Sequence, residues 1–207
     1  MPSSYDTIAK YYNGLFTGPL LNLFYNQSIN FIDKYLQDGF SFLDVGCGTG
    51  AFLKQLHKKR GGLLLFGVDE SRGMIDVCKK RHSSFAQFQV ARAETLPFET
   101  ASINFISAIN SFALFEKENF INECKRTLKP QGFLFINTIS PEKIKVFSKS
   151  LILLIKILGV DQGAKYLNLE QIKSLMQNKG FELIEAKDKM SPYLPVYKNW
   201  LLVFQKR

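Results

Sequence analysis

Two short apolar runs in this sequence each carry an acidic residue where a nucleoside could bind. The first run, Phe40–Val45, leads into the glycine-rich turn 46–50, and Asp44 stands just before that turn. The second run, Leu63–Val68, ends in Asp69. Glycines let a backbone approach a ligand closely, and a carboxylate at the end of a neighbouring strand can accept both hydroxyls of a ribose. The pattern predicts a nucleoside-binding edge.

The glycine spacing alone leaves two classes of cofactor open. Gly46, Gly48 and Ala51 also satisfy the relaxed dinucleotide fingerprint, so NAD is an alternative. Little of the chain remains to build the substrate domain of a dehydrogenase, however. The carboxylate of Asp44 would also oppose a pyrophosphate and attract an ammonium or sulfonium group. These two observations favour a cationic adenosine cofactor.

The composition is that of an ordinary globular protein, with 46% hydrophobic and 22% charged residues among 207. No segment approaches the roughly 20 apolar residues that a membrane span needs, and the N-terminus does not resemble a signal peptide. Three scattered cysteines show neither metal-ligand nor disulfide spacing. We therefore expect no metal and a cytoplasmic location.

The net charge of +9 suggests acidic partners, but its placement argues otherwise. The clusters Lys58–Arg60 and Lys79–Arg81 close two predicted helices, where the helix dipole favours cations. These ends lie away from the carboxyl edge of a parallel sheet, so a nucleic-acid partner is disfavoured.

Apolar runs alternate with helical stretches, which predicts a doubly wound α/β fold with a mostly parallel sheet. We expect strands at 40–46, 63–69, 85–91, 103–109 and 132–138, and helices at 49–59, 71–82 and 116–128. Flanking helices are expected at 5–12, 20–36, 141–158 and 168–179, with a closing strand pair at 181–189 and 199–206.

Several motifs occur in the order typical of one enzyme family. They are Leu43–Gly50, Gly67–Ser71, Leu96–Phe98, Arg126–Gly132 and the N-terminal tyrosine pattern 5–12. On these motifs the chain resembles a class I S-adenosylmethionine-dependent methyltransferase of the small-molecule type, similar to the ubiquinone and menaquinone methyltransferases. The family usually has a glycine at position 131, where this chain has glutamine.

The resemblance implies a Rossmann-like, mostly parallel seven-stranded sheet with a C-terminal antiparallel strand pair and N-terminal helices. It implies a single methyltransferase domain over 1–207. The expected parts are an N-terminal helical cap (1–39), a cofactor-binding core (40–139), a helical lid or insertion (140–180) and the closing strand pair (181–207).

The resemblance also assigns residues to the methionine half of S-adenosylmethionine. The turn 46–50 would pass under this half through Gly46, Gly48 and Gly50, with Cys47 between them. Asp44 would hold the amino group through water. Asn110 would lie near the methyl group, and Tyr12, with Tyr11, would close over the amino-acid end.

For the adenosine half, the resemblance implies that Asp69 binds the ribose and that Met74 packs on the adenine. Ala93 and Glu94 would border the adenine edge, and Glu70 completes the expected set. The family commonly has an aspartate at position 92, where it accepts from the adenine amino group. Arg92 has no acceptor, so either Glu94 replaces that contact or stacking and backbone hold the adenine.

No catalytic base can be assigned. The cofactor carries the reactive methyl group, so we expect catalysis by proximity and orientation. The stretch after the fourth strand lacks the histidine that oxygen-methylating relatives often have. His57 and His82 are expected at helix ends, partly exposed and remote from the chemistry. Other candidates for a base are Glu116, Glu94, Tyr11, Tyr12 and Tyr193.

The expected acceptor is a small molecule, apolar or aromatic. The apolar stretch 147–160 is interpreted as a helix covering the sheet or the acceptor pocket. Alternatives for it are a lid, a dimer contact or, with the lysines from 143 onward, weak contact with a membrane surface. We expect a monomer or homodimer. Rival functions are a protein or RNA methyltransferase and a cofactor-binding protein without turnover.

Overall fold

The structure is a computed structural model, and it describes residues 19–139, 164–190 and 198–207. The predictions for Tyr11, Tyr12 and Tyr193 therefore lie outside the described residues, as do those for the helix at 5–12 and the apolar stretch 147–160. Within the described ranges, no helix is long and apolar enough to cross a bilayer.

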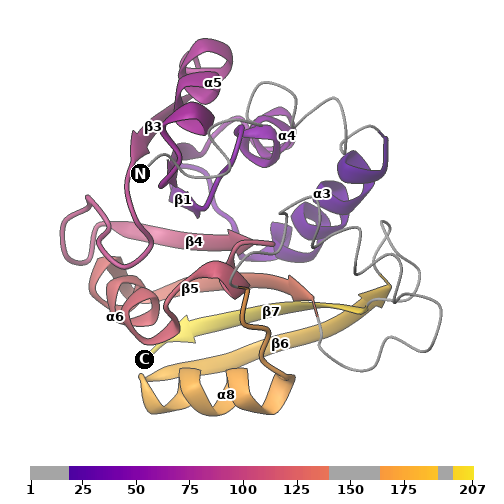
Figure 1. Cartoon of the computed structure of the whole chain (residues 1–207), viewed down its shortest axis with the longest axis vertical. Coiled ribbons are helices and arrows are strands. Elements are labelled where there is room, and N and C mark those ends of the chain that lie inside the picture. Colours follow the sequence, from indigo (N-terminus) through magenta and orange to yellow (C-terminus); the bar gives the residue numbers. More distant parts are fainter. Residues whose placement is uncertain (1–18, 140–163, 191–197) are drawn as a thin grey trace.

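The described strands form one seven-stranded sheet in the order β3-β2-β1-β4-β5-β7-β6 (Figure 1). They are β1 (Ser41–Val45), β2 (Leu64–Asp69), β3 (Ala86–Val90), β4 (Ile103–Ile109), β5 (Leu128–Ile139), β6 (Phe181–Met190) and β7 (Lys198–Lys206). Strands β1 to β5 pair in parallel, and β7 runs antiparallel to both β5 and β6. The predicted Rossmann-like fold and its closing antiparallel pair are confirmed. The strand order reverses between β1 and β4, which is where open α/β sheets bind ligands.

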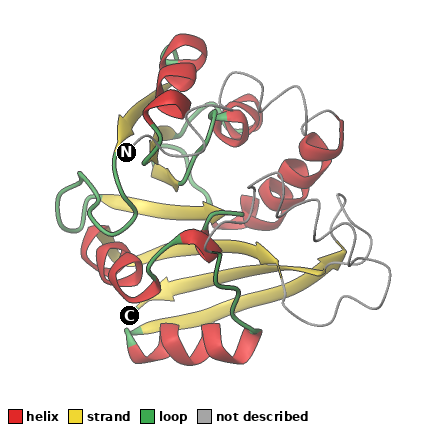
Figure 2. Cartoon of the chain, viewed as in Figure 1, coloured by secondary structure: helices red, strands yellow, loops and turns green. Residues whose placement is uncertain are grey.

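Helices cover both faces of this sheet (Figure 2). They are α3 (Pro19–Ile32), α4 (Ala51–Lys59), α5 (Arg72–His82), α6 (Lys117–Thr127) and α8 (Leu169–Asn178). Helices α3, α4 and α5 share one core with Phe42 of β1, and α6 and α8 share the other with Leu43. Because successive strand side chains point to opposite faces, one apolar strand supplies both cores. Helix α8, which falls in the predicted lid, packs against β6 through Ile172 and Met176.

Strand β5 begins earlier than the sequence predicts. Leu128 already pairs with Ile103, and the register then shifts between Ile103 and Phe105. The turn at 129–132 therefore interrupts β5 instead of preceding it. Gln131 adopts a φ of 62° there, a conformation in which glycine is normally favoured.

Candidate functional site

The glycine loop between β1 and α4 is held tightly by the neighbouring strand. The N–H groups of Gly46 and Cys47 both donate to the carbonyl of Val68, at 2.8 and 3.0 Å. Gly46 has a φ of 73°, and a Cβ added there would lie 2.5 Å from the Cβ of Ser111. The Ser111 hydroxyl in turn donates to the carbonyl of Val45 at 2.8 Å. Only glycine fits this position, because the conformation and the close approach both exclude a side chain.

The middle of the same loop is open. A Cβ added at Gly48 would meet no atom within 4 Å. The Gly48 N–H donates to Oδ2 of Asp69 at 2.9 Å, and the Ser71 N–H donates to Oδ1 at 2.9 Å. Two oxygens of a carboxylate offer about four acceptor positions. These two backbone groups orient the Asp69 carboxylate, and Asp69 lines the cavity described next.

A cavity of about 250 Å³ opens beside this loop at the carboxyl edge of the sheet. Its walls come from the glycine loop, the end of β2, the start of α5, the segment after β3, the segment after β4, and α3. The predicted cofactor residues that line it are Gly46, Cys47, Gly48, Asp69, Glu70, Met74, Ala93, Glu94 and Asn110. Residues from four separate segments of the sequence thus meet at one cavity.

Two predicted site residues, Asp44 and Gly50, are packed against protein and do not line this cavity. Asp44 is 2% exposed and accepts a 2.6 Å hydrogen bond from the hydroxyl of Ser107. Burial raises the pKa of Asp44 to about 7; the Ser107 bond opposes that shift and the charge of Asp69 adds to it. A Cβ on Gly50 would lie 3.0 Å from the His82 ring.

The adenine-edge residues proposed from the sequence form a chain of ion pairs. Nε of Arg92 lies 3.2 Å from Oε2 of Glu94, and its NH1 lies 3.9 Å from Oε2 of Glu70. The backbone N–H of Glu116 donates to the other oxygen of Glu94 at 2.9 Å. Both oxygens of Glu94 are therefore engaged, and Arg92 links Glu94 to Glu70.

Several cavity residues were not predicted from the sequence. They are Tyr25, Thr49, Ala91, Arg92, Ile109, Ser111, Leu114 and Phe115. The stretch from Ser111 to Phe115 directly follows a parallel strand, and that position was an available signal. Tyr25 had no such signal, because it lies on α3, well before the first strand in sequence. Its ring packs edge-on against Phe52 at 5.6 Å.

The candidate acid–base groups lie as follows. Glu94 lines the cavity, whereas the Glu116 side chain caps α6 by accepting from the Asn119 N–H at 2.9 Å. The expectation of a partly exposed His82 is wrong: it is 6% exposed, and burial lowers its pKa. Phe85 and Phe88 pack around its ring, so the end of α5 is covered by β3 and its preceding turn. His57 stacks on Phe85, and neither histidine lines the cavity.

Among residues 19–139, 164–190 and 198–207, no three His, Cys, Asp or Glu side chains gather as a metal site would require. The three cysteines are all buried free thiols. The thiol of Cys78 donates to the carbonyl of Gly48 at 3.1 Å, which ties α5 to the glycine loop.

Residues 43–136 match the model of the methyltransferase domain family. The matched range begins in β1 and ends in β5, so it contains the glycine loop and every strand whose carboxyl end borders the cavity.

Individual proteins resemble the chain in sequence or in structure. The demethylmenaquinone methyltransferase of Thermotoga maritima is 33% identical over 107 residues, which are 51% of this chain and 46% of that protein. The [4+2]-cyclase SpnF superposes with a TM-score of 0.80 at 17% identity, covering 99% of this chain and 96% of that one. The geranyl diphosphate C-methyltransferase of Streptomyces coelicolor, in complex with S-adenosyl-L-homocysteine, gives 0.76 at 16% identity, covering 99% of both chains. The chain spans half or less of the length of the first curated relatives it matches.

Proposed function

From the match over residues 43–136 we infer that the chain is a class I S-adenosylmethionine-dependent methyltransferase, and we propose that it methylates a small-molecule acceptor. The observation that carries the proposal is the open position at Gly48 beside a carboxylate, Asp69, that is already oriented by two backbone N–H groups. S-adenosylmethionine, when bound, supplies an electrophilic methyl group on a sulfonium. The residues of the chain would bind this cofactor and orient its methyl group toward the acceptor.

Each half of the cofactor has suitable partners in the cavity. Asp69 would accept from the ribose hydroxyls, with Met74 and Ala93 beside the adenine. Asp44, which accepts from Ser107 and lies outside the cavity lining, would act on the amino group of the methionine half through water, and with a pKa of about 7 it would be only partly ionised near neutral pH. The carboxylate of Asp69, which lines the cavity beside the glycine loop, disfavours a pyrophosphate there. This distribution of charge supports a cationic cofactor over NAD.

The acceptor side supports a small and partly apolar substrate. Leu114, Phe115 and Ile109 line the cavity next to Asn110, and Leu114 is 41% exposed. Lys58–Arg60 and Lys79–Arg81 end α4 and α5, away from the carboxyl edge. A groove for nucleic acid would need such cations at the active edge. The relative that methylates demethylmenaquinone, by its name, acts on a molecule of this kind.

We propose that proximity and orientation carry the catalysis. Methyl transfer from a sulfonium is an in-line displacement, and a general base matters only when the acceptor must lose a proton early. A rate that stays flat with pH near neutrality would support this mechanism. The pKa of Asp44 is itself about 7, so a rate that depends on a group with a pKa near that of histidine contradicts the mechanism only if Asp44→Asn keeps that dependence.

The rival function is cofactor binding without methyl transfer. A structure with the same fold carries the name of a [4+2]-cyclase, and fold alone does not decide activity. Incubation with S-adenosylmethionine and a broad panel of quinols, phenols, amines and prenyl compounds separates the two. Formation of S-adenosylhomocysteine with a methylated product supports transfer; tight binding without any product supports the rival.

Cofactor identity is tested by calorimetry with S-adenosylhomocysteine and NAD. Replacing Asp69→Ala removes charge-assisted hydrogen bonds worth about 1.5–3 kcal/mol each, so S-adenosylhomocysteine affinity should fall accordingly. Asp33→Ala is the control, because Asp33 pairs with Arg60 at the other edge of the sheet. Unchanged affinity in Asp69→Ala would place the ribose elsewhere, and saturation by NAD alone would overturn the proposal.

We also propose a cytoplasmic location and a single domain. The buried free thiols suit a reducing compartment. The two described cores lie on opposite faces of one continuous sheet, which supports one folding unit.

A further inference from the structure

The segment after β3 forms one wall of the cavity, and we call residues 91–98 the adenine-side loop. Its first four residues, Ala91 to Glu94, line the cavity. It contains neither a helix nor a strand. A loop that lacks the backbone hydrogen bonds of a helix or strand must be held in place by contacts with other parts of the molecule.

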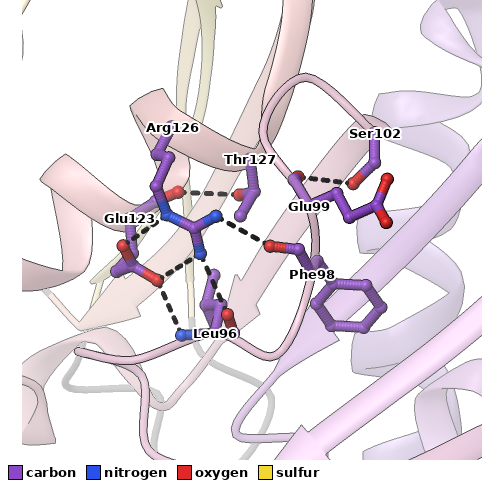
Figure 3. Close-up of polar contacts among 7 residues, drawn as sticks. All are labelled: Leu96, Phe98, Glu99, Ser102, Glu123, Arg126 and Thr127. Atoms are coloured by element: carbon purple, nitrogen blue, oxygen red, sulfur yellow. Dashed lines mark hydrogen bonds and ion pairs between the residues drawn. The ribbon is translucent and has the colours of Figure 1, made fainter.

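Helix α6 holds the far end of this loop through two side chains (Figure 3). The Arg126 guanidinium donates to the carbonyl of Phe98 at 2.7 Å and to the carbonyl of Leu96 at 2.9 Å. Glu123 accepts from the backbone N–H of Leu96 at 2.7 Å. Leu96 therefore uses both its N–H and its C=O in contacts with α6.

Arg126 and Glu123 also bind each other in a fork. Nε of Arg126 donates to Oε1 of Glu123 at 2.8 Å, and NH2 donates to Oε2 at 2.7 Å. Their side chains are 36% and 18% exposed, so solvent screens this pair less than a fully exposed one. The pairing lowers the pKa of Glu123 and raises that of Arg126, which keeps both charged. The result is a rigid unit that presents two donors and one acceptor to the loop.

The same helix also holds the near end of the loop. The N–H of Glu116, at the start of α6, donates to Glu94 at 2.9 Å. Asn110, Ser111, Leu114 and Phe115, which precede α6, also line the cavity. Helix α6 thus connects the wall on the adenine side with the wall that contains Asn110.

We propose that Arg126 and Glu123 are positioning residues for cofactor binding: they hold the adenine-side loop at the height where Ala93 and Glu94 meet the adenine. This inference rests on the proposed function. Neither residue lines the cavity, so both act through the loop backbone. Arginine is needed because its planar fork reaches one carboxylate and two carbonyls together, which a lysine ammonium cannot reproduce in that geometry.

The test compares Arg126→Gln with Arg60→Gln. Arg60 is a close match: it is 31% exposed, donates to a carboxylate of Asp33 at 2.8 Å and to the Asp33 carbonyl at 2.9 Å, but follows α4 at the other edge of the sheet. Both variants should lose stability in urea unfolding, and Arg126→Gln at least as much as Arg60→Gln, because Arg126 makes more hydrogen bonds. Only Arg126→Gln should bind S-adenosylhomocysteine about tenfold more weakly by calorimetry.

Two further measurements separate loop positioning from a general loss of stability. Arg126→Lys keeps the charge beside Glu123 but loses the carbonyl contacts, so its affinity should also fall, by about threefold. The probe 5′-methylthioadenosine contains only the adenosine half of the cofactor. Its affinity should fall in Arg126→Gln by the same factor as that of S-adenosylhomocysteine.

The outcomes distinguish this inference from the proposed function. If the unmodified protein binds no S-adenosylhomocysteine, the proposed function fails first. If it binds and Arg126→Gln binds equally well, or if Arg60→Gln loses as much affinity, the positioning role is overturned. An unchanged affinity for 5′-methylthioadenosine alone would also overturn it, because the loop would then not act on the adenosine half.

Discussion

The residues around the glycine loop fall into two sets with opposite surroundings. In the packed set, the Asp44 side chain and the Cβ position of Gly46 face other protein atoms, although Gly46 also lines the cavity: Ser107 lies 2.6 Å from the Asp44 carboxylate, and Ser111 blocks the Cβ position of Gly46. In the open set, Gly48 and Asp69 point at the cavity. The packed residues and Gly48 lie within a few residues of one motif, and Asp69 joins them from the end of β2.

The difference shows that the residues of the motif have two separate roles, one in folding and one in binding. The packed set makes the loop conformation possible, because nothing larger fits between β1 and the segment after β4. The open set leaves room and acceptors for a ligand. Substitutions in the packed set should mainly lower stability, and substitutions in the open set should mainly lower affinity.

The largest effect is expected for Gly46→Ala in the packed set. The left-handed conformation costs about 1–2 kcal/mol, and the overlap with Ser111 adds about 1–3 kcal/mol. Urea unfolding should show the sum as a loss of unfolding free energy. Gly39→Ala is the control, because Gly39 also has a positive φ, 83°, but no neighbour within 4 Å. Equal losses of unfolding free energy in both variants would mean that Ser111 moves away from the added methyl group without cost.

The next effect is the pH dependence caused by Asp44. Its pKa rises from 3.8 in a free chain to about 7 in the fold. Between these two pKa values the folded protein holds a proton that the unfolded chain has released. The stabilisation that this proton gives is fully present below pH 3.8 and is lost as pH rises through about 7. The unfolding free energy should fall by about 2–4 kcal/mol across that window.

Asp44→Asn should remove most of this slope, measured by urea unfolding between pH 4 and pH 8. Asp33→Asn should keep it, because the ion pair with Arg60 lowers the pKa of Asp33 and places its titration below the window. An unaltered slope in Asp44→Asn would show that Asp44 is ionised throughout and that its burial is offset by other groups.

The smallest effect on stability, with a clear effect on affinity, is expected for Gly48→Ala in the open set. The positive φ of 53° costs about 1–2 kcal/mol of unfolding free energy, close to that of Gly39→Ala. The added methyl group projects into the cavity, so S-adenosylhomocysteine should bind with about 1–3 kcal/mol less free energy. Calorimetry measures this, and full affinity in Gly48→Ala would erase the distinction between the two sets.

Much of the fold could be predicted because it depends on local patterns. The strands and helices of the core lie within a few residues of their expected positions, and Asp69 ends β2 as the apolar run predicts. Parallel strands joined by helices bring their carboxyl ends to one edge. Once the strands were recognised, the common location of Gly48, Asp69 and Asn110 followed from connectivity alone.

Other features could not be read from any local pattern. Tyr25 reaches the cavity only because α3 packs on the same face as α4. His82 is buried because Phe85 and Phe88 cover it. The early start of β5 depends on Leu128 pairing with Ile103. Each of these depends on which neighbours the fold brings into contact.

The sequence by itself determined the strand–loop–helix alternation, the glycine turn and the placement of two carboxylates at one edge, because these follow from short-range periodicity and chain connectivity. Only the tertiary structure decided which carboxylate is buried against Ser107 and which faces the cavity, and that α6 holds the adenine-side loop through Arg126. Burial and multi-centre hydrogen bonds depend on residues distant in sequence, and their energies arise only when the packed neighbours replace water.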